Sequence, residues 1–415
     1  METRDRRAAR PSEPASGALA MMLADIRALA GEIGIRFMGS EADARAAKYL
    51  ARRSADIGLA PEIMAFPVMG WRLREPASLA IDRDGKPTWR VECYPYVYSA
   101  STPAGGARGR IVPAGRQELF GSKFRPFERP KFRFRKYDIR MEDGTVAGQI
   151  VSRDFPVGAL PAAWGVLPLP RTMPMVMIGE SDGRRLEEIA AQGGAAATMQ
   201  IAGQFDAEAI SANVVGQLAG ADPRRAAEKI LVMAHFDTQY TGPGAVDNAS
   251  GVAALLALAA HFAGARPDHG LVFALYSGEE VGFVGARQHL AVLKDRGELG
   301  AIRAVLNLDM LACNEPNWIH ASADFLAQES ARRAAAALTI AERYGGLEIV
   351  TPCWPSGDQD PFDDEGIPCV SFTWKGYKYR HTHTPEDTPD KVDERVLADS
   401  FALARQVVIN LDKML

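Results

Sequence analysis

The second half of the sequence predicts an α/β fold, a three-layer sandwich with a mostly parallel, mixed sheet. The first observation is that strand-type apolar runs alternate with helix-type segments from Ile210 onward. This alternation favours parallel strands covered by helices on both faces. The second observation is that the histidine and acidic residues of this half fall where the strands end. The third is a change of texture over residues 77–205, which indicates a β-rich insertion.

The elements of the sandwich can be taken in chain order. KILVMAHFD, LVFALYS and AIRAVLNLDML are typical of buried strands, and SGVAALLALAAHFA and VGFVGARQHLAVLK are typical of the helices between them. A long Ala-rich helix is predicted over 323–344. Strands are predicted at LEIVTP and IPCVSFTW, followed by an amphipathic helix from Lys391 to the end. The longest apolar run, Val252 to Ala263, is too short to cross a bilayer, so it predicts a buried helix.

The first half divides into three parts. Residues 1–16 are charged and rich in Pro, Ser and Ala, which predicts a disordered lead. Residues 17–76 begin with helices, and Ser40 followed by Asp43 resembles a capping box. Residues 77–205 are the predicted β-rich insertion. The main α/β domain would therefore comprise residues 17–76 and 206–415.

Composition excludes several classes of protein. A formal net charge of -4 argues against a protein that binds nucleic acid by neutralising phosphates. The four cysteines are scattered and lack the C-x-x-C spacing of a structural zinc site. The N-terminal segment has no apolar stretch of the signal-peptide kind. We therefore expect a cytoplasmic protein with no membrane or nucleic-acid partner.

Five segments of the second half bring a histidine or a carboxylate to a strand end or to the loop beyond it. The residues concerned are His235, Asp237, Asp247, Glu279, Glu280, Asp309 and His383. In open α/β sheets the ligand crevice lies beyond the carboxyl ends of the strands. Taken alone, each residue has an ordinary structural explanation, such as a turn cap or a solvated helix start. Because all of these residues are expected at the same edge of one sheet, the sequence predicts a functional site there.

Two histidines with three or more carboxylates suit a pair of divalent ions of the zinc type, because a carboxylate can bridge two cations. Such a pair provides a hydroxide nucleophile at neutral pH. Hydrolysis also needs a base that does not bind metal. The adjacent pair Glu279 and Glu280 can divide these tasks, because neighbours on an extended chain point in opposite directions.

Four blocks of this half carry a family resemblance: AHFDTQYTGPGAVDNASG, LYSGEEVGFVGAR, LNLDML and HTHTPEDT. In this order they resemble the signature blocks of the M28 family of zinc aminopeptidases. The resemblance implies a zinc-peptidase type of sandwich as the catalytic domain. The segment MPMVMIGESDGRRLEEIAAQGGAAATM resembles the protease-associated domain that is often inserted in this family.

The resemblance also implies a role for each site residue. His235 and Asp309 would complete one zinc, Glu280 and His383 the other, and Asp247 would bridge the two. Two catalytic residues would not bind metal. Glu279 would be the general base and acid, and Asp237 would fix the imidazole of His235.

The loop after IPCVSFTW holds a second histidine, His381, two residues before His383. Either histidine can reach a metal, and the match to HTPEDT favours His383. His381 would then lie at the rim and touch substrate. Trp374, Tyr377 and Phe362 flank the same edge, where they would either line the substrate pocket or belong to the core. The basic, aromatic run from Phe120 to Arg140 predicts an exposed hairpin of the insertion. A grip on an acidic substrate terminus and a subunit interface are its functional alternatives.

The predicted activity is hydrolysis of a peptide or small amide substrate by two Zn²⁺ ions, with Co²⁺ or Mn²⁺ as alternative metals. Release of an N-terminal amino acid is the favoured reaction. A carboxypeptidase, a dipeptidase or a hydrolase of a non-peptide amide would use the same site. A glutaminyl cyclase, which usually uses one zinc, is disfavoured by the five ligands, and a receptor-like member by the retained base. The oligomeric state is open.

Overall fold

The computed structural model describes residues 16–84, 86–119, 132–153, 170–313, 316–321, 348–350, 357–374, 379 and 381–415. Several sequence-based predictions fall outside these ranges. They concern nearly all of the N-terminal lead, the Ala-rich helix at 323–344, residues 120–131 of the basic run, and Tyr377.

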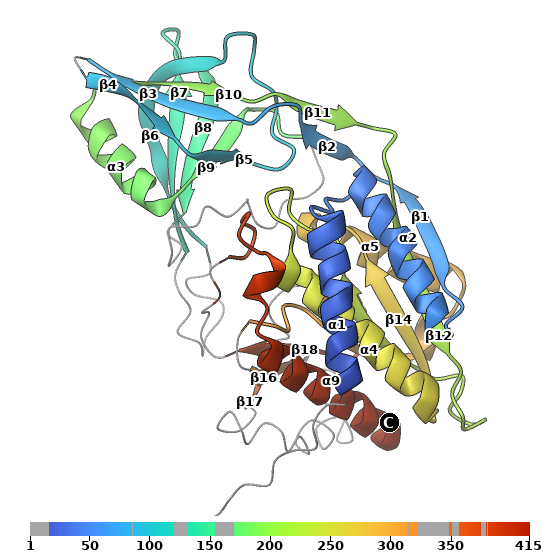
Figure 1. The fold of residues 1–415 in the computed structure, drawn as a ribbon. Helices are drawn as coiled ribbons and strands as arrows, with labels where there is room; N and C mark the ends of the chain where they lie inside the picture. The colour runs from blue at the N-terminus through green and yellow to red at the C-terminus, as the bar shows by residue number, and fades with distance from the viewer. Residues whose placement is uncertain are drawn as a thin grey trace, which may run out of the picture.

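A mixed, eight-stranded sheet forms the centre of the larger lobe (Figure 1). Four neighbouring strands in its middle run parallel: β14 (Gly270–Tyr276), β13 (Lys229–His235), β15 (Ile302–Asn307) and β18 (Cys369–Trp374). Two further strands lie on each side: β12 (Ile210–Leu218) and β1 (Glu62–Pro67) on one, β16 (Pro316–Ala321) and β17 (Glu348–Val350) on the other. Every residue of β14 is buried, as expected for a strand covered on both faces.

Helices cover both faces of this sheet, as predicted. One face carries α1 (Ser16–Ile26), α2 (Glu41–Asp56), α4 (Ser250–Ala265) and α9 (Glu394–Met414). The other carries α5 (Val284–Asp295) and the short α8 (Asp360–Asp363). Successive residues of β13 alternate between the two cores: Val232 joins the first and Met233 the second.

Helix α4 is the most apolar helix of the described chain. Together with the turn before it, Ala245–Ala265 is long and apolar enough to cross a membrane, but 72% of its apolar window is buried inside the molecule. It packs between α1, α9 and the sheet (Figure 1). The predicted buried helix is therefore confirmed as a core element.

The start and end of α2 follow the local sequence. The hydroxyl of Ser40 accepts a hydrogen bond from the main-chain N–H of Asp43 at 3.1 Å, which satisfies one free donor of the first turn. The helix ends at Asp56, and Gly58 adopts a φ of 96° just beyond it. A π-helical segment, Arg27–Ile33, precedes this helix.

A second eight-stranded sheet forms the smaller lobe, which α3 (Glu180–Gln192) covers (Figure 1). Its strands, in spatial order, are β4 (Lys86–Val91), β3 (Ser78–Arg83), β10 (Ala195–Gln200), β6 (Ala107–Leu119), β7 (Phe132–Arg140), β8 (Val146–Arg153), β9 (Met175–Ile178) and β5 (Cys93–Pro95). All of them lie within residues 77–205. The domain division itself, and the protease-associated resemblance, remain predictions.

The two lobes are joined by a short antiparallel ribbon of β2 (Gly70–Leu73) and β11 (Gly203–Asp206), visible between the sheets in Figure 1. An aromatic cluster lies beside it. The rings of Trp71 and Tyr240 meet edge to face, with centroids 5.1 Å apart. The hydroxyl of Tyr240 donates a hydrogen bond to the carbonyl oxygen of Pro95, at the end of β5. These contacts hold the smaller lobe against the loop that follows β13.

Candidate metal centre

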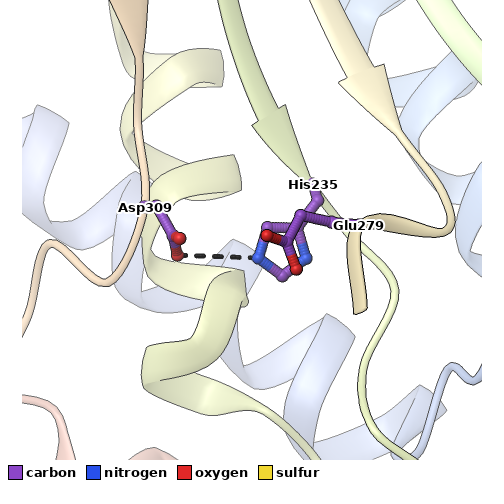
Figure 2. A group of neighbouring side chains, drawn as sticks. All are labelled: His235, Glu279 and Asp309. Carbon is purple, nitrogen blue, oxygen red and sulfur yellow. Dashed lines mark ion pairs between the residues drawn. The ribbon is translucent and has the colours of Figure 1, made fainter. Parts of the chain in front are cut away.

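The carboxyl ends of the three central parallel strands deliver the first site residues. His235 is the last residue of β13, and Asp309 lies two residues beyond β15. Glu279 and Glu280 begin a 3-10 turn just after β14. Figure 2 shows Asp309 directed toward the ring of His235, with Glu279 beside them. The meeting of these residues at one sheet edge is what the strand-end pattern predicted.

The turn that carries the two glutamates depends on Gly278. Its φ is 92°, a left-handed conformation that favours glycine. A Cβ at this position would also lie 2.5 Å from the sulfur of Met38 and 2.9 Å from the Cβ of Val284, so these neighbours would have to move. The carboxylate of Asp237 accepts hydrogen bonds from the main-chain N–H groups of Glu279 and Glu280, at 3.1 and 3.4 Å. Asp237 therefore fixes this turn to the end of β13.

The loop that carries Asp247 is held from two sides. The carboxylate of Asp387 accepts hydrogen bonds from the main-chain N–H groups of Val246 and Asp247, at 2.9 and 3.1 Å. The Asn248 side chain donates to the carbonyl of Leu308 at 2.9 Å and accepts from the N–H of Met310 at 3.1 Å. The loops that carry Asp247 and Asp309 are thereby joined to each other.

Asp247 lies between the two histidines. Its Oδ1 is 3.4 Å from His235 Nε2, and its Oδ2 is 3.1 Å from His383 Nε2. On the His235 side, Nε2 is 3.5 Å from Asp309 Oδ1. On the other side, His383 Nε2 is 2.9 Å from Glu280 Oε2. One carboxylate therefore faces both halves of the site, as a bridging ligand must.

These separations fit the geometry of zinc. Two ligand atoms, each 2.0–2.1 Å from a tetrahedral zinc ion, lie about 3.3 Å from each other. The donor atoms fall into two groups within mutual reach. The first comprises His235, Glu279 and Asp309, and the second comprises Asp247, Glu280 and His383.

Several donor atoms of the site are buried without a hydrogen-bond partner in the described part of the chain. They include Nε2 of His235, Oδ1 of Asp309 and Oε1 of Glu280. Native proteins leave few buried polar atoms unsatisfied, so such atoms in one place call for a missing partner. Imidazole and carboxylate together are a donor set suited to zinc. The residues present therefore fit zinc.

The acidic groups of the centre are electrostatically strained without a cation. Burial raises the pKa of Glu279 well above its ordinary value, His235 opposes this shift, and Glu280 and Asp309 add to it. Burial also raises the pKa of Asp309 and of Glu280. Asp247 differs: burial alone would raise its pKa, but the neighbouring imidazoles of His235 and His383 outweigh burial and lower it.

The two histidines respond in the opposite direction. Burial disfavours the charged ring of His383, but Glu280 and Asp247 outweigh it and raise its pKa to about 10. The same balance, with Glu279 as the main carboxylate, raises the pKa of His235 well above its ordinary value. Protons and metal would compete for these rings, because a metal-ligating imidazole must be neutral on the binding nitrogen.

Exposure differs across the site. His235, Asp247, Glu280 and His383 are buried, whereas Glu279 and Asp309 are partly exposed. The carboxylate predicted to act as the base is therefore on the accessible side of the centre.

Three residues that hold this centre together are not among the site residues predicted from the sequence. The side chain of Arg36 is fully buried and donates hydrogen bonds to five carbonyls, those of Leu29, Gly34, Phe236, Pro243 and Gly244. Asp387 and Gln239 are the other two. Asp387 belongs to the HTPEDT block and Gln239 to the AHFDTQYTGPGAVDNASG block, and both blocks were usable signals. Arg36 gave none, because Phe236, Pro243 and Gly244 lie 200 to 208 residues away in the sequence.

The predicted substrate residues have different outcomes. His381 is partly exposed, and its Nδ1 lies 2.8 Å from Glu386 Oε2. Phe362 does not line a pocket: it is fully buried, in the core beneath α5, and meets the ring of His289 edge to face with centroids 6.4 Å apart. That prediction is wrong, because α8 turns this ring inward. The side chain of Trp374 and all of Tyr377 are outside the described residues.

The fold and site define a class of protein: an α/β sandwich with a two-part histidine–carboxylate centre at the strand ends. Residues 213–408 match the family model described as "Peptidase family M28". This match covers slightly less than half of the chain, and it agrees with the family resemblance of the four sequence blocks.

Solved structures share the whole fold. A peptidase M28 precursor from Shewanella amazonensis SB2B aligns with a TM-score of 0.75 at 20% identity, over 95% of this chain and 93% of that chain. An aminopeptidase from Aneurinibacillus sp. strain AM-1 aligns with a TM-score of 0.68 at 20% identity, over 94% and 93%. The predicted fold class is confirmed.

Curated relatives match less than half of the chain. Leucine aminopeptidase 2 of Trichophyton rubrum is 29% identical over 191 residues, which cover 46% of this chain and 37% of the relative. Aminopeptidase YwaD of Bacillus subtilis is 26% identical over 183 residues, covering 43% and 40%. The chain therefore spans well under half the length of these relatives.

Proposed function

We propose that the protein is a zinc-dependent peptidase that releases N-terminal amino acids, and that it uses two zinc ions. The observation that carries the proposal is the position of Asp247 between His235 and His383, at 3.4 and 3.1 Å. A carboxylate shared in this way gives each half of the site a complete set of donors. The proposed zinc ligands are His235, Asp247, Glu280, Asp309 and His383.

The comparisons support the proposal. Relatives are named leucine aminopeptidase 2 and aminopeptidase YwaD, and a structure of the same fold is described as a zinc aminopeptidase from Bacillus subtilis. That structure aligns with a TM-score of 0.65 at 20% identity, which shows the same fold.

The chain's own residues divide the work of hydrolysis. When bound, the zinc ions lower the pKa of water and polarise the substrate carbonyl. Glu279 is the proposed base: it takes a proton from the attacking water and returns it to the leaving amine. Asp237 holds both His235, with 3.4 Å between Oδ1 and Nδ1, and the main chain of Glu279. Asp237 therefore fixes the position of the proposed base, Glu279, relative to the proposed ligand, His235.

The proposal is tested by removing metal with a chelator and restoring it, while a panel of peptides is assayed. We expect activity to disappear with zinc, to return with two equivalents, and to require a free α-amine. N-acetylated peptides should be inert and C-amidated peptides should be cleaved. Cleavage of acetylated peptides from the carboxyl end would instead identify a carboxypeptidase, and activity without metal would overturn the proposal.

A further inference from the structure

Gln239 holds both ends of Glu280 through one amide group. Its Nε2 lies 3.1 Å from the main-chain oxygen and 3.1 Å from Oε2 of Glu280. Both side chains are buried, with 2% of Gln239 and 5% of Glu280 exposed. Rotation of the glutamate side chain about any bond between these two acceptors would break one of the contacts. The amide therefore fixes the carboxylate relative to its own main chain.

The oxygen that Gln239 holds is also the one that faces the second histidine. Glu280 Oε2 is 2.9 Å from His383 Nε2, whereas Glu280 Oε1 has no hydrogen-bond partner among the described residues. A carboxylate oxygen carries two lone pairs. Oε2 can therefore accept a hydrogen bond from Gln239 and still offer an electron pair to an ion.

Gln239 reaches the same space as the proposed ligands. It lines a small cavity together with Asp247, Glu280 and His383, and the cavity volume is about 10 Å³. A space of this size accommodates about one water molecule or ion. The other end of the amide, Gln239 Oε1, is buried and has no hydrogen-bond partner within the described ranges. It is thus available as an acceptor for a water bound in this cavity.

We propose that Gln239 is a positioning residue for Glu280, whose carboxylate it holds beside Asp247 and His383, where the three side chains would bind one ion. This inference rests on the proposed function, because it requires that zinc occupy this half of the site. Gln239 itself binds no metal. Hydrogen bonds to metal-ligating carboxylates preset the direction of the ligand, and their loss typically weakens metal binding.

The experiment compares zinc binding by the wild-type protein and by two variants, Gln239→Met and Gln239→Glu. Methionine keeps the length of the side chain without a donor, and glutamate keeps the shape but replaces the donor by an acceptor. Gln406→Met is the matched control. Gln406 lies on α9, and its side-chain amide donates a hydrogen bond to Asn410 Oδ1 at 2.8 Å. Apoprotein is titrated with zinc in competition with a chromophoric chelator, and the Tm of each apoprotein is measured.

We expect both Gln239 variants to bind one zinc about 10- to 100-fold more weakly, with the other zinc and the apoprotein Tm unchanged. The control should bind both ions as the wild-type protein does. Unchanged zinc affinities in both Gln239 variants would overturn this inference alone, as would a lower apoprotein Tm with unchanged affinity. A wild-type protein that binds no zinc would overturn the proposed function, and this inference with it.

Discussion

Asp237 connects the proposed base to the metal centre through the main chain of Glu279. Its Oδ1 accepts a hydrogen bond from the Glu279 N–H at 3.1 Å and lies 3.4 Å from His235 Nδ1. The same carboxylate is fully buried. A single side chain therefore sets both the ring orientation of a proposed ligand and the position of the residue that would move protons.

Replacing Asp237 by asparagine should weaken zinc binding and slow turnover together. The amide is neutral, so it loses the electrostatic hold on the His235 ring, although it can still accept the hydrogen bond from Glu279. We expect a loss of about 10- to 100-fold in zinc affinity. Chelator competition and kcat at saturating zinc measure the two effects separately. Unchanged zinc affinity would remove Asp237 from the support of His235.

Replacing Glu279 by glutamine should remove activity while leaving zinc in place. The amide matches the carboxylate in shape but cannot take a proton, so kcat should fall by about 10²- to 10⁴-fold. Metal analysis of the purified variant is the necessary second measurement. Because Glu279 lies within reach of His235 and Asp309, loss of one zinc would instead assign it as a ligand.

The two histidines of the HTHTPEDT segment should behave differently on substitution. His383 is buried and faces Asp247 and Glu280, so His383→Ala should release one zinc. His381 is partly exposed and contacts Glu386, so His381→Ala should retain both ions. Metal content and the KM for peptides distinguish the cases. The reverse pattern of zinc loss would exchange the two assignments.

Acid should destabilise the fold partly through His289. Burial lowers the pKa of this residue to about 4, and its Nδ1 lies 2.6 Å from the hydroxyl of Tyr276. The unfolded chain binds a proton near pH 6.5 and the folded chain near pH 4. Stability from this group is therefore complete above pH 6.5 and is lost as pH falls toward 4. From pH 7.5 to pH 5 the loss is about 2 kcal/mol.

The test compares urea unfolding of the wild-type protein and of His289→Gln at both pH values, with metal absent. Glutamine offers the Tyr276 hydroxyl an acceptor that does not titrate in this range. We expect the pH dependence of the unfolding free energy to be smaller in the variant by that amount. An equal pH dependence of the unfolding free energy in the two proteins would mean that His289 does not change its protonation state on unfolding.

The sequence predicted those parts of the site that depend on local pattern. His235 and Asp309 follow strands whose apolar runs are unmistakable, and the parallel topology then brings their side chains to one edge. Asp247 and Glu280 were assigned with the help of the family resemblance, and the structure brings them within reach of His383.

The remaining residues could not be predicted because their roles depend on tertiary contacts. Nothing near Arg36 in the sequence indicates that its guanidinium meets carbonyls some 200 residues away. Phe362 was placed at a pocket because it lies next to a loop of the site. The direction of its ring was decided by packing against His289, which no local pattern encodes. The ribbon of β2 and β11 was missed for the same reason, since its strands are short and their pairing is distant.

Leu73 and Gly203 are paired neighbours at the end of that ribbon. With respect to the larger sheet, the residues between Leu73 and Gly203 are one long insertion. This insertion begins and ends at a paired position, as the loop of a β-hairpin does. The chain leaves and re-enters the main lobe at one place, so the strand pairings of the larger sheet do not include the segment between. The segment still contributes to the site's surroundings, because Tyr98 and Met177 pack in one buried cluster with Val281, next to Glu280.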